Sequence, residues 1–134
     1  MRTVIVMSVR SLFLSAPERR FVAAGEVIYA EGEPGTHMYG LVEGAIELRK
    51  RGAVVALLGP DDVFGERALI DNRPRDLTAV ATEPTVIAEI DRYLFLFLVD
   101  QSPTFALDIM GALAERLRAY DNWVASLVEG DAAR

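Results

Sequence analysis

The sequence contains no cysteine and only one histidine, His37. Without cysteine, the chain can form no disulfide and no thiolate metal site. A single histidine also excludes the metal centres, built from several histidines, that many small-barrel enzymes use. No nucleophile with an adjacent base stands out either, so we expect neither a metal site nor an enzyme.

Positive charge is scarce as well, because 14 Lys and Arg stand against 20 Asp and Glu, for a formal net charge of −6. This balance opposes a general attraction to nucleic acid or to an anionic membrane, so an anionic ligand would need a local positive site. The densest apolar stretch, Tyr93 to Val99, is too short to span a membrane. Arg10 interrupts the N-terminal apolar run before it reaches the length of a signal peptide, so we expect a cytoplasmic protein.

The length of 134 residues, with 51% hydrophobic content, suits one buried core and is short for two ordinary domains. We therefore expect a single domain over residues 1–134. It divides into an N-terminal helical segment (1–20), a β region (21–90) and C-terminal helices (91–128).

Short apolar runs separated by turn residues fill the β region, which favours a sandwich or barrel. Closing these strands into a jelly-roll hides their edges. Residues 66–70 are not β-like and indicate a short inserted helix. The fold class is therefore mainly β with flanking helices, a β jelly-roll (double-stranded β-helix) followed by a long C-terminal helix. The predicted strands are Val27–Ala30, Met38–Val42, Ala45–Arg49, Val54–Leu58, Leu77–Ala81 and Val86–Ile90.

Two helices are predicted after residue 90. Asp91 can cap a short helix over about 92–99, and Ser102 followed by Pro103 can start a longer one that ends near Val128. Along the longer helix, apolar residues recur at alternating spacings of four and three. They are Ala106, Met110, Leu113, Leu117, Tyr120, Val124 and Leu127.

This seven-residue repeat predicts a seam between two helices. With Met110, Leu117 and Val124 at the a positions, Arg116 falls at g and Asp121 at the next e, where charges pair across a parallel dimer. We therefore expect a homodimer through this helix. The alternative is that the same apolar face packs on its own barrel.

The inserted segment carries the clearest chemical pattern. Gly65 frees the backbone, a one-turn helix presents its N-terminal amides, and Arg75 follows nine residues after Glu66, which together predict an anion pocket. The simpler interpretation is that Glu66 caps the helix, Arg75 is a solvated loop arginine and Gly65 serves a tight turn.

This segment resembles the phosphate-binding cassette of cyclic-nucleotide-binding domains, in which Phe-Gly-Glu precedes small or apolar residues, a short loop and Pro-Arg before Thr. Residues 25–35, 39–44 and 57–63 are similar to the family's opening strands, its glycine turns and its approach to the cassette. Residues 113–118 are similar to the dimer helix of bacterial regulators of the catabolite activator type. The resemblance covers about residues 21–128 and implies a jelly-roll whose following helix senses or covers the ligand.

The resemblance also implies a ligand, cAMP or cGMP, and a role for each residue of the cassette (64–79). Arg75 would hold the cyclic phosphate with its planar fork, and Glu66 would accept a hydrogen bond from the ribose 2′-hydroxyl. Backbone amides of the loop would complete the phosphate site. The implied ligand-binding residues are Phe64, Gly65, Glu66, Arg67, Ala68, Arg75, Asp76, Leu77 and Thr78. The implied base contacts are Arg116, Tyr120 and Asp121, of which Tyr120 also fits a packing role in the seam.

Asp76 departs from the family pattern, which has a small residue beside the phosphate. If the Asp76 carboxylate lies about 4 Å from the phosphate, at an effective dielectric near 20, the two negative charges repel each other by about 4 kcal/mol. This repulsion would lower the affinity by roughly three orders of magnitude. Arg67 or Arg73 could neutralise this charge, or the carboxylate could turn toward solvent. Asp76 could also accept a hydrogen bond from a guanine amino group.

Two hypotheses follow. The first is a stand-alone regulatory module that binds cAMP or cGMP and couples it to the C-terminal helix. The second is a degenerate, non-binding domain of the same fold that acts as a dimeric protein-interaction module. Only six residues follow Val128, so we expect no DNA-binding helix-turn-helix, and an output domain could lie on a separate chain.

Overall fold

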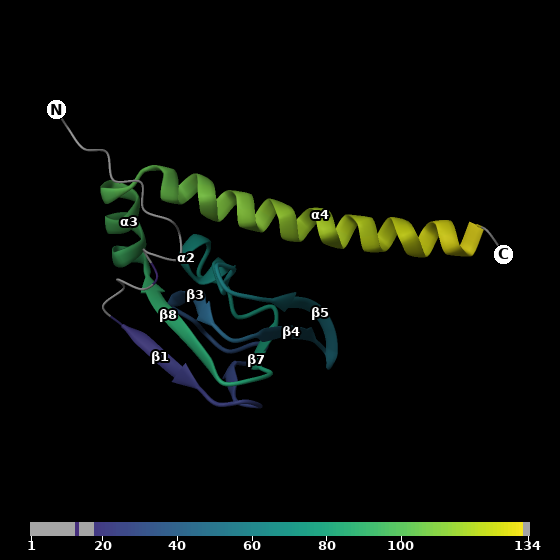
Figure 1. The fold of residues 1–134 in the computed structure, drawn as a ribbon, viewed down its shortest axis with the longest axis horizontal. Coiled ribbons are helices and arrows are strands. Elements are labelled where there is room, and N and C mark those ends of the chain that lie inside the picture. The colour runs from purple at the N-terminus through teal and green to yellow at the C-terminus, as the bar shows by residue number, and fades with distance from the viewer. Residues whose placement is uncertain (1–12, 14–17, 133–134) are drawn as a thin grey trace.

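The computed structural model describes Phe13 and residues 18–132. Within these residues, eight strands form two antiparallel four-stranded sheets (Figure 1). The first sheet has the order β1 (Arg19–Val22), β8 (Thr85–Asp91), β3 (His37–Glu43) and β6 (Val63–Phe64). The second has the order β2 (Val27–Tyr29), β7 (Thr78–Ala81), β4 (Ile46–Lys50) and β5 (Ala53–Leu58). The predicted jelly-roll is confirmed.

Three further elements are helical. The one-turn helix α2 (Arg67–Ile70) lies between β6 and β7, where the sequence predicts an insertion. Helices α3 (Arg92–Gln101) and α4 (Thr104–Ala132) follow the last strand, and the Asp91 carboxylate caps α3 by accepting from the Leu94 amide at 2.7 Å. Helix α4 passes over α2 and continues beyond the barrel (Figure 1). No single helix in the described part of the chain is long and apolar enough to cross a membrane.

The sequence did not predict β1 or β6. Arg19 and Arg20 belong to β1 and pair with Ala88 and Ile87, which corrects their assignment to the N-terminal helical segment. The rest of that segment lies outside the described residues, apart from the helical Phe13 and from Glu18, which is in neither a helix nor a strand. Helix α4 extends to Ala132, four residues past its predicted end.

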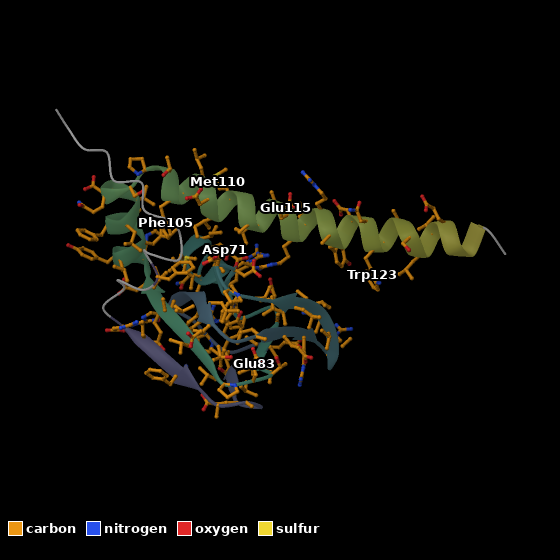
Figure 2. The ribbon with its side chains drawn as sticks, viewed as in Figure 1. Asp71, Glu83, Phe105, Met110, Glu115 and Trp123 are labelled. Atoms are coloured by element: carbon orange, nitrogen blue, oxygen red, sulfur yellow. The ribbon has the colours of Figure 1, made fainter. Side chains whose placement is uncertain are left out.

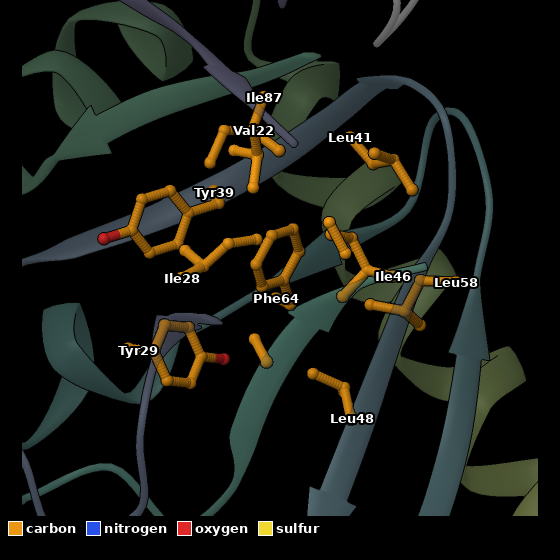
Figure 3. Close-up of a cluster of buried hydrophobic side chains, with 12 residues drawn as sticks. Val22, Ile28, Tyr29, Tyr39, Leu41, Ile46, Leu48, Leu58, Phe64 and Ile87 are labelled. Carbon is orange, nitrogen blue, oxygen red and sulfur yellow. The ribbon is translucent and has the colours of Figure 1, made fainter. Parts of the chain in front are cut away.

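Two hydrophobic cores hold the domain together. One lies between the sheets and includes Leu41, Ile46, Phe64 and Ile87, all fully buried (Figure 3). The other lies between the first sheet and the helices and includes Val63, Phe105 and Ile109. The sheet that holds β3 and β8 is thus buried on both faces, which explains why those strands read as nearly continuous apolar runs.

The buried apolar residues of helix α4 lie near its start. Phe105 and Ile109 are buried against the barrel and α3, but the residues of the predicted seam are mostly exposed. Met110 and Trp123 are exposed on α4. Trp123, whose ring centre lies 5.9 Å from that of Tyr120, is on the part of the helix that projects past the barrel (Figure 2). The exposed seam residues are Met110, Leu117, Tyr120, Val124 and Leu127. The seam past Leu113 therefore does not pack on its own barrel.

Candidate functional site

A small pocket opens beside α2, where the inserted loop meets the second sheet and α4. Its volume is about 80 Å³. The lining combines eight residues of the inserted loop with Tyr29, Leu48 and Arg116. The eight loop residues are Gly65, Glu66, Arg67, Ala68, Arg73, Arg75, Asp76 and Leu77. Most of the residues predicted for the ligand site thus meet at one place.

Position 65 requires a glycine for two reasons, its backbone conformation and the close approach of Arg75. Its φ of +72° lies in the left-handed region, and a Cβ there would lie 2.8 Å from the Arg75 Nη1 atom. Arg75 Nη1 donates to the Gly65 carbonyl at 2.8 Å. The turn before α2 is therefore shaped so that the arginine guanidinium can lie directly against it.

Arg75 is buried, with 8% of its surface exposed. Its Nη2 donates to the His37 carbonyl at 2.8 Å, and its Cζ lies 4.2 Å from the centre of the Tyr29 ring. Its Nε is buried and has no hydrogen-bond partner among the described residues. Arg75 is therefore not a solvated loop arginine. It is a fixed cation that retains an unpaired donor, and such a donor is costly to bury unless a ligand uses it.

The turn at residues 31–35 holds Arg75 in place from the other side. The Arg75 amide donates to the Glu33 carbonyl and the Gly32 amide donates to the Arg75 carbonyl, both at 2.8 Å. Gly35 faces the guanidinium so closely that a Cβ there would lie 2.4 Å from Cζ. The fold thus fixes both the backbone and the side chain of Arg75.

Glu66 occupies the N-cap position of α2 but does not act as a cap. Its side chain makes no capping hydrogen bond, and no Lys or Arg in the described chain forms an ion pair with it. Half-buried in the pocket wall, its carboxylate is free to accept hydrogen bonds from a ligand.

Arg67 pairs with the unusual Asp76. Its Nη1 lies 3.2 Å from the Asp76 carboxylate, and its Nη2 donates to Asp71 at 2.9 Å. The hydrogen bond to Asp71 raises the pKa of Arg67, so the guanidinium stays charged. For Asp71, desolvation acts to raise the pKa, but the hydrogen bonds from Arg67 and from the Arg73 amide, with the charges of both arginines, together lower it. The negative charge of Asp76 is thus offset by a neighbouring cation.

Two tyrosines close the inner wall around Arg75. Burial raises the pKa of both Tyr29 and Tyr39, and the nearby Arg75 opposes this rise without cancelling it. Both side chains therefore remain neutral. Tyr29, Tyr39 and Phe64 stack on one another with ring centres 5.3–6.1 Å apart, which makes a rigid aromatic support beneath the guanidinium.

Some predicted site residues support the pocket and do not line it. Phe64 is fully buried in the inner core, and the Thr78 hydroxyl accepts from the Glu31 amide at 3.0 Å. Ala68 does line the pocket, and its amide, implied as a phosphate donor, has a long 3.3 Å hydrogen bond to the Gly65 carbonyl.

The three implied base contacts lie at different distances from the pocket. Arg116 lines it and donates to the Val63 carbonyl, which connects α4 to β6. Tyr120 and Asp121 are exposed on the projecting part of α4 and are not part of the pocket lining.

Sequence reasoning missed the residues that fix Arg75 from distant parts of the chain. These are Tyr29, Gly35 and the His37 carbonyl. The only available signal was the glycine turn at 31–35, which the sequence suggests is a structural turn and which proves to be a contact surface for the guanidinium.

The structure thus combines a jelly-roll, a buried arginine beside a carboxylate without an ion pair, and a long helix over the pocket. The family model of the cyclic nucleotide-binding domain matches residues 19–102. The chain belongs to this family, whose related chains are regulatory binding proteins and not enzymes.

Known proteins support this assignment. The chain is 34% identical over 115 residues to the cyclic AMP receptor protein of Thermus thermophilus, an alignment that covers 82% of this chain and 53% of the relative. The crystal structure of Thermus thermophilus catabolite activator protein superposes with a TM-score of 0.69 and 32% identity, covering 90% of this chain and 57% of that one. The chain thus spans about half the length of the curated relatives it matches.

A third similar chain is matched almost end to end. It is a solved structure from a cyclic-GMP-dependent signalling pathway that regulates bacterial phytopathogenesis. The TM-score is 0.64 and the identity 26%, with 93% of this chain and 98% of that chain covered.

Proposed function

We propose that this domain is a cytoplasmic regulatory module that binds cAMP or cGMP beside α2 and couples the ligand to helix α4. The observation that carries the proposal is the buried guanidinium of Arg75, whose Nε has no partner among the described residues. A cyclic phosphate would supply the missing acceptor through a charge-assisted hydrogen bond.

The two charged groups of the pocket suit the two polar parts of such a ligand. Arg75 would hold the phosphate, because the hydrogen bonds to Gly65 and His37 leave three of its five N–H groups free. Glu66 would accept from the ribose 2′-hydroxyl, because its carboxylate is neither capping α2 nor ion-paired. The loop amides of Arg67, Ala68 and Leu77 would complete the phosphate site.

Arg67 supports binding over the degenerate alternative. The repulsion expected from Asp76 assumes an unpaired carboxylate, whereas Asp76 lies 3.2 Å from the Arg67 guanidinium and is about half exposed. A paired and solvated carboxylate repels a phosphate far less than an isolated one.

The pocket must open to admit a whole nucleotide. Its 80 Å³ is well below the roughly 300 Å³ at which ligand pockets begin. Arg116 narrows it from the α4 side, and its contact with Val63 would give way when the base enters. Nucleotide would then bind better to the arrangement in which Arg116 has moved, which couples the ligand to α4.

The exposed seam of α4 supports a parallel homodimer. Its apolar a and d positions remain in solvent in the single chain, and a second copy would cover them. In the dimer, Arg116 at g would face the partner's Asp121 at e. An Arg116 guanidinium that leaves Val63 when the base enters would be free to pair with that aspartate, so pocket opening and helix pairing would favour each other.

Isothermal titration with cAMP and with cGMP tests the binding proposal. We expect saturable binding of at least one nucleotide, weakened about a hundredfold by Arg75→Ala because charge-assisted hydrogen bonds are lost. Glu66→Gln should weaken it about tenfold. Arg51→Ala, which removes an exposed arginine at the β4–β5 turn, is the matched control. No heat at high micromolar nucleotide, or equal affinity in Arg75→Ala, would contradict the proposal.

The small pocket is the observation that favours the degenerate alternative, a dimeric interaction module that binds no nucleotide. That alternative predicts that Asp76→Ser creates binding that the natural chain lacks. Micromolar binding of nucleotide by the natural chain would contradict the non-binding alternative. If nucleotide does bind, Arg67→Gln should weaken it by exposing the charge of Asp76, and Asp76→Asn in the same chain should restore it.

A further inference from the structure

A second group of titratable side chains lies outside the nucleotide pocket. Glu18, His37 and Glu89 offer one ligand atom each, and these atoms all lie within 4.8 Å of one another. The strand order explains why these three side chains lie close together. β8 pairs with β1 on one side and with β3 on the other, so Glu89 of β8 lies between His37 at the start of β3 and Glu18 just before β1.

His37 is already oriented by a neighbour. The Thr36 hydroxyl lies 2.9 Å from its Nδ1, which leaves Nε2 as the nitrogen that can bind another group. Metal-binding histidines commonly have their second ring nitrogen held by such a hydrogen-bond partner, which fixes the ring and its tautomer.

The two carboxylates lack a matching cation. Glu18 has no ion pair in the described chain. Glu89 has only a 3.8 Å contact with Arg20 Nη1, while Arg20 Nη2 donates to Glu26 at 3.2 Å. Two carboxylates held this close repel each other, and a bound cation would remove that repulsion.

The cluster lies on a cavity of about 290 Å³, larger than the nucleotide pocket, and the two share no lining residue. Asp91, Tyr93, Leu94 and Phe97 complete its lining where β8 leads into α3 (Figure 1). Asp91 is engaged in capping α3. The cavity leaves room for a cation and for water or a small ligand at its open coordination positions.

We propose that Glu18, His37 and Glu89 form a binding site for a divalent metal ion of the zinc type. Three ligand atoms bound at about 2.1 Å to a tetrahedral ion lie roughly 3.4 Å apart, so side-chain rotations that bring them up to about 1.4 Å closer would complete the site. Glu18 is exposed and the other two are half-buried, so such rotations need no repacking of the core.

The chemistry of the ligand set selects the ion. An imidazole nitrogen favours Zn²⁺ over Mg²⁺ and Ca²⁺, which prefer oxygen ligands alone. The single histidine of this sequence excludes a centre built from several histidines, but it does not exclude one histidine with two carboxylates. A bound ion would tie β1 to the centre of its sheet, and it would stabilise the folded state by mass action.

Because His37 is the only histidine, one experiment reads the site directly. In NMR spectra of the full chain, all imidazole ¹⁵N and ¹H signals come from this one ring. The titration adds Zn²⁺ alone, without nucleotide. We expect the Nε2 signal to shift and saturate near one equivalent of Zn²⁺, while Mg²⁺ at the same concentration leaves it unchanged. An unchanged ring in excess Zn²⁺ would overturn the proposal, whatever the fate of nucleotide binding.

Variants separate the cluster from chance binding by one histidine. Glu18→Gln and Glu89→Gln each keep the side-chain shape and should weaken zinc binding at least about tenfold, and Thr36→Val should weaken it about tenfold by releasing Nδ1. Glu83→Gln, an exposed change in the turn before β8, is the control. Thermal unfolding without metal confirms that each variant is folded. Equal zinc affinity in all of them would show adventitious binding and refute the site.

Discussion

Arg75 is held in place by the fold and is also the residue that would bind the phosphate. Burying a guanidinium is unfavourable unless its charge and its donors are satisfied. Here two carbonyls accept from it and the face of Tyr29 lies 4.2 Å away, a favourable place for a cation. Nε is the buried atom of this side chain that has no hydrogen-bond partner among the described residues. The protein thus holds a cation ready for an anion.

The Gly35→Ala variant tests how much the position of the Arg75 guanidinium matters for stability and for nucleotide affinity. In Gly35→Ala the new Cβ would lie 2.4 Å from Cζ, so we expect the guanidinium to shift. Overpacking of this kind costs about 1–3 kcal/mol of unfolding free energy. Nucleotide affinity should fall at least about tenfold, measured by urea unfolding and titration. Gly59→Ala is the control, because a Cβ there meets nothing within 4 Å. Equal behaviour of the two variants would contradict the geometry described for Arg75.

From the raised pKa of Tyr29 we predict how the stability of the fold changes at alkaline pH. Burial raises the pKa of its hydroxyl above the ordinary 10.0, and Arg75 opposes this only in part. The unfolded chain therefore loses this proton at a lower pH than the folded chain. The stability due to neutral Tyr29 is complete below the ordinary pKa and is lost as the pH rises above it.

The Tyr29→Phe variant checks this sign. Phenylalanine keeps the ring beneath Arg75 and removes the ionising group. Urea unfolding near pH 8 and about pH 11 should show a smaller alkaline loss of stability in Tyr29→Phe than in the natural chain. A loss of the same size in both proteins would mean that other groups cause it.

At the scale of elements, the sequence predicts strands where apolar residues alternate or run together between turns. It misses β1, because Arg19, Arg20 and the exposed Phe21 leave only Val22 buried at a sheet edge. It also misses β6, because two residues are too few to show any period. Both elements exist through their pairing with β8 and β3, which is a property of the fold and not of the local chain.

The candidate site shows the same division. Residues close together in the inserted loop, such as Glu66, Arg67 and Arg75, could be predicted because their spacing carries the pattern. Tyr29, Gly35 and the His37 carbonyl could not be predicted, because only tertiary folding brings them to Arg75. The pairing of Arg67 with Asp76 was one of several options in the sequence, and the structure selects it.

Helix α4 has an apolar seam that the single chain leaves exposed. Leu117 is 61% exposed at an a position, so Leu117→Glu should disrupt a dimer while the barrel stays folded. Sedimentation equilibrium should show a shift toward monomer. Ala119→Glu, also exposed but outside the seam, should leave the association unchanged. If the natural chain is monomeric at high concentration, the proposed dimer is wrong.

At the scale of the whole molecule, two cores meet at one sheet. The inner core fixes Tyr29, Tyr39 and Phe64 beneath Arg75, and the outer core attaches α3 and the start of α4 to the other face. Arg116 is the side chain of α4 that reaches the pocket. A ligand that displaces Arg116 can therefore act on α4 without unfolding either core, and helix pairing must in turn alter nucleotide affinity by the same free energy.

The central claim is that Arg75 holds the phosphate of a cyclic nucleotide. Its Nε–H signal in a ¹⁵N spectrum, assigned by its loss in Arg75→Lys, reports that contact directly. We predict that cAMP or cGMP shifts this signal strongly toward a hydrogen-bonded position, and that the shift saturates with one ligand per chain. A signal that stays in place at high micromolar concentrations of both nucleotides would contradict the account.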